Sequence, residues 1–154
     1  MNVWWCNQSR CWPDEFDARV VCSSTRTSQP KFRAMVQNAR KGDITVHYRK
    51  PRGIVAVSRA LADAAAYGPS DKRPICRLYG QGFIFSAEYH VFDTPVPRND
   101  VLESLSRLPI DDGPVVQFRD GRTQIRQAYF MPFSTTGLRI VRRAGNDEDW
   151  PEWA

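Results

Sequence analysis

The sequence has little histidine, little lysine and no long apolar segment. No Ser–His–acid, Cys–His or metal-binding cluster occurs at a spacing that identifies a catalytic site, and His47 and His90 are the only histidines. No apolar run approaches the roughly 20 residues that cross a bilayer. The chain does not open on a basic segment followed by an apolar stretch, which is the pattern of a secretion signal. We therefore expect a cytoplasmic protein that binds a partner, has no contact with membranes and is not an enzyme.

Cysteine is also scarce, and its spacing is not that of a structural zinc site. The chain has four cysteines: Cys6, Cys11, Cys22 and Cys76. Structural zinc ligands usually come in close pairs on a turn, and the spacings between these four cysteines are not of that kind. We expect free thiols, no bound metal and no cofactor. A zinc site built from three of the thiols with His47 or His90 is the alternative.

The charge is unevenly distributed. The segment 146–154, "NDEDWPEWA", holds four acids and no base, so residues 1–145 carry +9 (22 bases against 13 acids). Eighteen of the bases are arginine, whose planar guanidinium suits both phosphate contacts and stacking on flat rings. A GC-rich genome would give the same bias. The charge nevertheless predicts an anionic partner, with nucleic acid first.

Alternation of apolar and polar residues predicts several strands in what has the length of one domain. Four stretches are read as strands: "NVWWCNQ", "GDITVHYRK", "GIVAVSRAL" and "GFIFSAEYHVF". The third is apolar on both faces, as a central strand would be, and the other three alternate. The loop 49–53, "RKPRG", joins the second and third of these as a basic hairpin tip. Asp120 and Gly121 predict a further turn, within "PVVQFRDGRTQIRQAYFMPF".

Helical spacing is found in three places: "SQPKFRAMVQNARKGD", "RNDVLESLSRL" and "STTGLRIVRR". The last of these would also serve as a strand. Strands broken by helices predict an α+β domain over residues 1–145, in which a mixed sheet curls on itself and about three helices flank it. The acidic tail 146–154 is expected to be flexible, with Trp150 and Trp153 as its anchors if it docks.

Three stretches together resemble the EVE-type domains of the PUA-like superfamily, most closely those fused to HNH nucleases in modification-dependent restriction systems. They are "WWCNQ", "KGDITVHYRKPRGIVAVSRAL" and "GRTQIRQAYFMPFS", and the resemblance covers about residues 3 to 143. The matching positions are Trp4, Asn7, Gln8, Gly42, Asp43, His47, Tyr48, Gln127, Tyr129 and Phe130. "PVVQFRDGR" is also similar to a stretch of the YTH domains, which read N6-methyladenosine.

The resemblance implies a PUA-like pseudo-barrel that reads a modified base after flipping it into an aromatic pocket. The expected partner is DNA with a methylated or hydroxymethylated base, such as 5-methylcytosine or N6-methyladenine. The domain would be the specificity module of a restriction or defence system, with a nuclease supplied in cis or in trans. An RNA-binding PUA-like module acting on tRNA or rRNA is the alternative. A small hydrolase or transferase that uses Asp43 or His47 is a third reading.

The predicted base pocket combines flat rings for stacking with polar groups for reading the edge of a base. Its residues are Trp5, Asn7, Gln8, Trp12, Cys22, Asp43, His47, Tyr48 and Tyr67. Alternation places Trp5 on one face with Asn7, although such rings also belong in cores and such amides also satisfy loop backbone. Related readers carry a cage tryptophan at or near the position of Cys22, for which Trp12 or Tyr67 would substitute.

Two arginine-rich turns are expected to contact the nucleic-acid backbone. Their residues are Arg49, Lys50, Arg52, Arg119, Arg122 and Arg126. If both turns border one groove, these side chains would hold phosphates, and binding would weaken steeply as salt rises. The alternative is a solvated basic surface.

Overall fold

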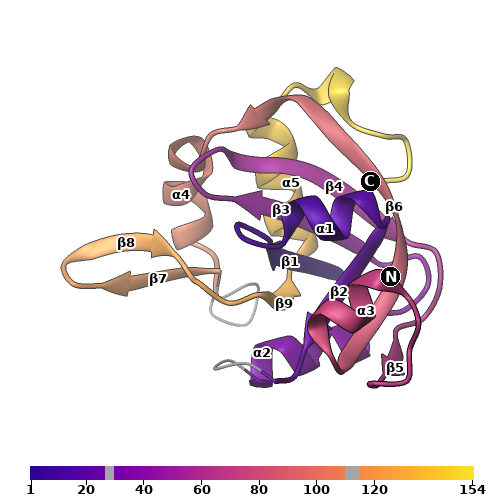
Figure 1. The fold of residues 1–154 in the computed structure, drawn as a ribbon. Coiled ribbons are helices and arrows are strands. Elements are labelled where there is room, and N and C mark those ends of the chain that lie inside the picture. The colour runs from indigo at the N-terminus through magenta and orange to yellow at the C-terminus, as the bar shows by residue number, and fades with distance from the viewer. Residues whose placement is uncertain (27–29, 110–114) are drawn as a thin grey trace.

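The fold is built around one curled sheet (Figure 1). A computed structural model describes residues 1–26, 30–109 and 115–154. The sheet consists of β1 (Val3–Asn7), β2 (Val20–Ser24), β3 (Ile44–Arg49), β4 (Gly53–Ala60), β5 (Ala65–Tyr67), β6 (Gly82–Val96) and β9 (Phe130–Phe133). The strand order is β2-β6-β4-β3-β1-β9, with β5 beside β6. Two further strands, β7 (Val116–Arg119) and β8 (Arg122–Ile125), form a separate hairpin.

The long strand β6 produces the curl of the sheet. Its first residues pair with β2 and β5, and the part from Ala87 to Val96 pairs with β4. Gly82 permits the approach of β2, because a Cβ atom there would lie 1.8 Å from the carbonyl oxygen of Ser23. At the other side of the sheet β1 runs parallel to β3 and antiparallel to β9. The α+β class and the curled mixed sheet expected from the sequence are therefore confirmed.

Within the described residues five α-helices surround the sheet, where about three were expected. They are α1 (Trp12–Asp17), α2 (Pro30–Ala34), α3 (Pro74–Tyr79), α4 (Arg98–Ser106) and α5 (Thr135–Ala144). The 3₁₀ turns η1 (Met35–Asn38) and η3 (Asp147–Asp149) add to them. The segment 135–144 is helical and not a strand, and the Ser134 hydroxyl caps it by accepting from the Gly137 amide. The first two residues of the stretch predicted as a helix before Pro30 lie outside the described residues.

No helix in the described ranges is long and apolar enough to cross a bilayer.

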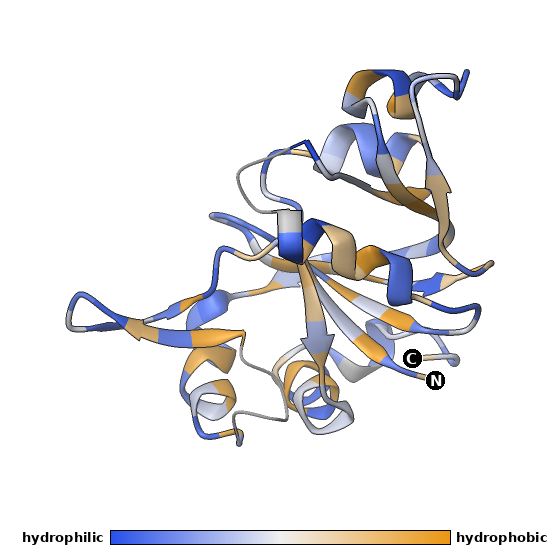
Figure 2. Ribbon diagram, turned by 90° about the horizontal axis from the view of Figure 1, so that it is seen from below, coloured by the Kyte–Doolittle hydropathy of each residue, from blue (hydrophilic) through white to orange (hydrophobic). Residues whose placement is uncertain are grey.

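Two hydrophobic clusters fill the two sides of the sheet, and the adjacent tryptophans of β1 belong to different ones. Trp5 is completely buried in the larger cluster, where its ring stacks on Tyr48 at 5.6 Å. Trp4 lies in the second cluster and stacks on Phe130 at 4.9 Å. Because both faces of the strand are covered, β1 is hydrophobic on both sides. Figure 2 shows hydrophobic residues along the strands, whereas the turn of the projecting hairpin is hydrophilic.

The acidic tail is docked, where we expected a flexible segment. Trp150 is buried in the larger cluster with its ring 4.9 Å from that of Phe92. His90 and the backbone amide of Asp93 both bond to Asp149. The hydrophobic contact of one indole and these bonds fix the segment, and they place Asp149 beside His90 and Asp93.

Candidate functional site

A buried hydrogen-bonded chain connects two of the residues that the sequence had assigned to a pocket, Gln8 and His47, with Ser58. The Nδ1 atom of His47 lies 2.5 Å from the Oε1 atom of Gln8, and its Nε2 atom lies 2.7 Å from the hydroxyl of Ser58. All three side chains are completely buried. Burial lowers the pKa of His47 to about 3. The imidazole is therefore neutral and joins β1 to β3 and β4 as a structural tie.

Glu15 is the partner that sequence reasoning missed. Its carboxylate accepts from the Nε2 atom of Gln8 at 2.6 Å, from the amide of Cys22 at 2.7 Å and from the hydroxyl of Tyr129. Burial raises the pKa of Glu15 to about 7, against the opposing effect of these donors. Glu15 lies in α1, a six-residue helix without a periodic apolar pattern. The sequence gives no local signal that this acid, unlike its neighbour Asp14, is buried.

Asp43 has a comparable role at the start of β3. Although burial would raise its pKa, the donors around it lower the pKa below the ordinary value. These donors are the amide and side chain of Asn2, the indole of Trp4 at 2.9 Å, and the amide of Arg40. The carboxylate thus fixes the N-terminal strand to the turn before β3.

The predicted pocket residues do not surround an open slot in the described structure, and the prediction is corrected accordingly. The Trp5 and Tyr48 rings are packed in the core, and Trp12 is 7% exposed with its ring stacked on Phe16. Tyr67 donates its hydroxyl to the Ser23 carbonyl. The remaining predicted residues are Asn7, whose side chain accepts from Ser9, and Cys22, which is buried in a separate small cluster. Both sides of the sheet are covered, so rings on either face meet protein and not solvent.

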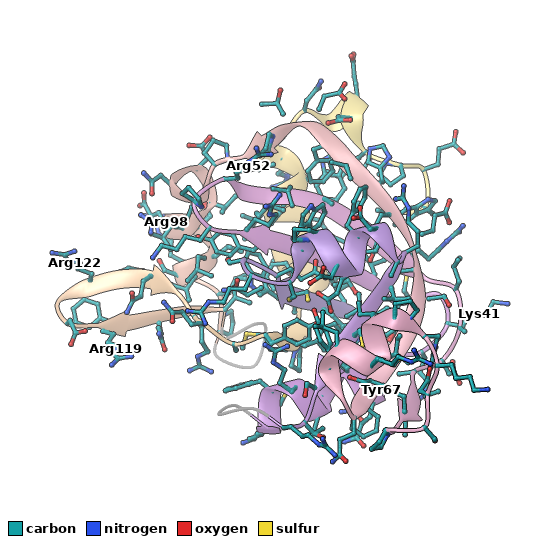
Figure 3. All side chains as sticks on the ribbon, viewed as in Figure 1. Lys41, Arg52, Tyr67, Arg98, Arg119 and Arg122 are labelled. Carbon is teal, nitrogen blue, oxygen red and sulfur yellow. The ribbon has the colours of Figure 1, made fainter. Side chains whose placement is uncertain are left out.

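The arginine-rich turns lie apart from each other. Arg49 places its guanidinium 5.4 Å from the Trp12 ring, and burial lowers its pKa. The backbone amide of Lys50 donates to Ser9, and Arg52 is exposed at the end of the turn. Figure 3 shows Arg52 separated from Arg119 and Arg122, which extend from the two strands at the tip of the hairpin. The two turns do not line one shared groove within the described residues.

The β7–β8 hairpin forms as the sequence predicted. Asp120 and Gly121 have φ values of 54° and 70°, and two positive φ angles define the tight two-residue turn that suits a hairpin. Val116 and Ile125 pair directly on one face, and Gln117 and Gln124 pair directly on the other. The hairpin projects from the body on the side of α4 (Figure 1). The YTH-like stretch begins at residue 114, which lies outside the described residues.

A polar groove of about 360 Å³ lies between this hairpin and α2. The residues that line it and carry chemistry are Phe32, Gln117, Arg119, Gln124, Arg126 and Gln127. Among the described residues of its wall Asp120 is the one acid, and its carboxylate lies 3.5 Å from Arg119. Of the positions predicted from sequence, the groove contains Arg119 and Arg126. It also contains Gln127, which belongs to the third stretch of the family resemblance.

The groove offers carboxamides that are not used by the fold. The side chains of Gln117, Gln124 and Gln127 make no hydrogen bond to another described residue. Each amide has two donor hydrogens and an acceptor oxygen. Phe32 is half-buried and presents an aromatic surface beside them. Together these groups can hydrogen-bond the edge of a flat polar ring and contact its face.

The described residues do not form a metal site comparable to this groove. No group of three or more His, Cys, Asp and Glu side chains there is arranged to hold an ion. The four cysteines are free thiols, and three of them are buried. Burial raises the pKa of Cys22 to about 12, so this thiol is protonated.

Comparison with known proteins finds other structures with this fold but does not identify an activity. No family model matches the sequence, and no curated protein does. A hypothetical protein from Leishmania major has a similar structure, with a TM-score of 0.60 and 11% identity over 97% of this chain and 98% of that one. A protein from Agrobacterium tumefaciens has a TM-score of 0.56 and 15% identity, over 94% of each chain. At such identities the likeness establishes that this α+β fold is shared along the whole chain, and nothing more.

Proposed function

We propose that the protein binds nucleic acid and reads a modified base, held in the groove between α2 and the β7–β8 hairpin. The target is DNA with a methylated or hydroxymethylated base, and the protein is a PUA-like reader of the EVE type. The observation that carries the proposal is the set of three uncommitted carboxamides beside an aromatic ring and two arginines.

The size and chemistry of the groove support this choice of ligand. Its volume of about 360 Å³ lies in the range of small-molecule sites. A carboxamide can pair with two adjacent base atoms through one donor and one acceptor, which is how Asn and Gln recognise bases. A base must leave its stack to lie in such a groove, because in a duplex its faces are stacked and its Watson–Crick edge is paired.

The charge around the groove favours nucleic acid over an uncharged ligand. Arg119 and Arg126 line it, and Arg122 lies directly opposite Arg119 at the tip. Arg33, one residue after Phe32, holds its guanidinium 4.1 Å from the centre of the Tyr129 ring. These cations would contact phosphates on either side of a bound base and orient the strand without specifying its sequence.

The protein acts in this proposal as a recognition module in the cytoplasm and leaves cleavage to a nuclease in cis or in trans. His47 is neutral, buried and hydrogen-bonded at both nitrogens, so it offers no base to a substrate. Asp43 is occupied by four donors of the fold. Because the hydrogen bonds of both side chains are used within the fold, they argue against the hydrolase or transferase hypothesis.

The test is a binding titration with matched duplexes that differ at one base. One series carries 5-methylcytosine, 5-hydroxymethylcytosine or N6-methyladenine, a second is unmodified, and single-stranded RNA of the same sequence is a competitor. We expect one modified duplex to bind more tightly than its unmodified partner. Equal affinity for every duplex contradicts the proposal, and preference for the RNA would instead indicate the RNA-binding alternative.

Variants connect this binding to the groove. Replacing Gln124→Met removes the amide at similar length, and we expect it to reduce discrimination between modified and unmodified DNA. Replacing Arg126→Gln should weaken both duplexes alike and lower the slope of log affinity against log salt by about 1. Arg77→Gln, an exposed arginine on α3, is the matched control and should change neither quantity. If Arg77→Gln has the same effect as Arg126→Gln, the groove is not the site.

A further inference from the structure

The ring of Phe118 projects into solvent from the β7–β8 hairpin. Its side chain is 75% exposed, whereas every other aromatic residue in the ranges 1–26, 30–109 and 115–154 is buried or half-buried. Aromatic rings are usually largely buried, because they carry much apolar surface. This ring makes little contribution to folding, so its exposure points to a partner.

The position of Phe118 follows from the register of the hairpin. Alternation places it on the face of Val116, and Val116 pairs with Ile125, which is buried against the main core. The apolar face that docks the hairpin therefore continues past the edge of the body and ends in Phe118. Gln117 and Gln124, which line the groove, lie on the opposite face.

Two arginines lie at the tip next to the exposed ring. They are Arg119 and Arg122, which flank the turn, and the acid of the turn itself is Asp120. Figure 3 shows both arginines extending outward from the tip. A protein partner would need a desolvated apolar surface ringed by acids here. The phosphates of a duplex offer the complementary charge continuously, and the major groove of DNA admits a two-stranded β-ribbon.

We propose that the hairpin enters the DNA and that Phe118 packs against the base next to the one held in the groove. This inference rests on the proposed function. Flipping a base leaves its neighbour without a stacking partner, and apolar side chains such as Phe fill such gaps in other DNA complexes. With Phe118 on one face and the groove on the other, the hairpin would separate the extruded base from the remaining stack. The tight turn at Asp120 and Gly121 holds the two faces in a fixed relation.

The experiment compares Phe118→Ala with the wild type on two duplexes. In the first the modified base is correctly paired, and in the second it faces a mismatch and is already partly unstacked. We expect Phe118→Ala to weaken binding to the paired duplex about tenfold and to the mismatched duplex by clearly less, because the ring supports unstacking. Phe118→Trp should restore binding. Leu78→Ala, which removes an exposed apolar side chain on α3, is the control.

A fluorescent base analogue beside the modified position gives a second measurement. Binding of the wild type should change its fluorescence as the stack opens and the ring enters, and Phe118→Ala should give a different signal at saturation. Unchanged affinity of Phe118→Ala for the paired duplex overturns the inference, as does an equal loss on both duplexes. If Phe118→Ala still prefers the modified duplex, the proposed function survives. If the wild type shows no preference, the proposed function fails as well.

Discussion

The hydroxyl of Tyr129 donates a hydrogen bond to the buried carboxylate of Glu15, which lies 114 residues earlier in the chain. The same hydroxyl lies 2.9 Å from the carbonyl oxygen of Cys22. One phenol thus joins α1, β2 and the segment that enters β9. Arg33 covers the outer face of its ring, near the candidate groove.

Replacing Tyr129→Phe should lower the free energy of unfolding by about 2 kcal/mol, because the buried carboxyl group of Glu15 loses its donor. Urea denaturation followed by circular dichroism measures this change. Tyr79→Phe is the matched control, since the Tyr79 hydroxyl is buried without a partner among the described residues. We expect its removal to be neutral or slightly stabilising. Equal losses in the two variants would mean that the Tyr129 bond contributes nothing specific.

Glu15 should make the protein less stable as the pH rises. Its pKa is about 7 in the folded state against an ordinary 4.5, so the folded state binds the proton more tightly. The contribution is fully present below about pH 4.5 and is lost as the pH rises through 7. Glu15→Gln should flatten this part of the profile of unfolding free energy against pH. An unchanged slope in the variant would show that Glu15 does not titrate there.

His47 should act in the opposite direction. Its pKa is about 3 when folded against an ordinary 6.5, so the unfolded state binds the proton more tightly. The stability that it contributes is present above pH 6.5 and is lost as the pH falls toward 3. His47→Gln should reduce the loss of stability between these values, measured by urea denaturation at each pH. An equal loss of stability in His47→Gln and in the wild type would show that His47 does not titrate in this range.

Removal of the Trp150 side chain tests the docking of the acidic tail. Trp150→Ala should lower the free energy of unfolding by about 3 kcal/mol, as expected for a large buried ring. Limited proteolysis should then cleave the last residues more readily. Trp153→Ala is the comparison, because that ring is only partly buried and contacts Arg59. A Trp150→Ala protein that is fully stable would contradict the anchoring role.

The strands could be predicted from the sequence because each is a short run of alternating or continuously apolar residues bounded by turn signals. β1, β3 and β4 lie where the pattern placed them, and the Asp120–Gly121 turn follows from the conformational needs of a two-residue hairpin. α1 and α3 were missed because six residues are too few to display a helical period.

The site was harder to predict, and the reason is geometric. Alternation tells which residues share a face with Trp5, but not whether that face meets solvent, a helix or another strand. Here both faces are covered, so the rings of β1 became core. Glu15 was missed because its partners are distant in sequence. The groove unites Phe32 with Gln117 and Gln124, and only the tertiary structure brings these segments together.

The place of β1 between β3 and β9 has a consequence for biosynthesis. Strand β1 needs Ile44–Arg49 on one side and Phe130–Phe133 on the other, so its second edge stays open until β9 has also left the ribosome. Pairings so distant in sequence are slow to form, and an unpaired strand edge invites association with other chains. A nascent polypeptide of this kind has particular need of chaperones, and translation through β9 is a precondition for closure of its sheet.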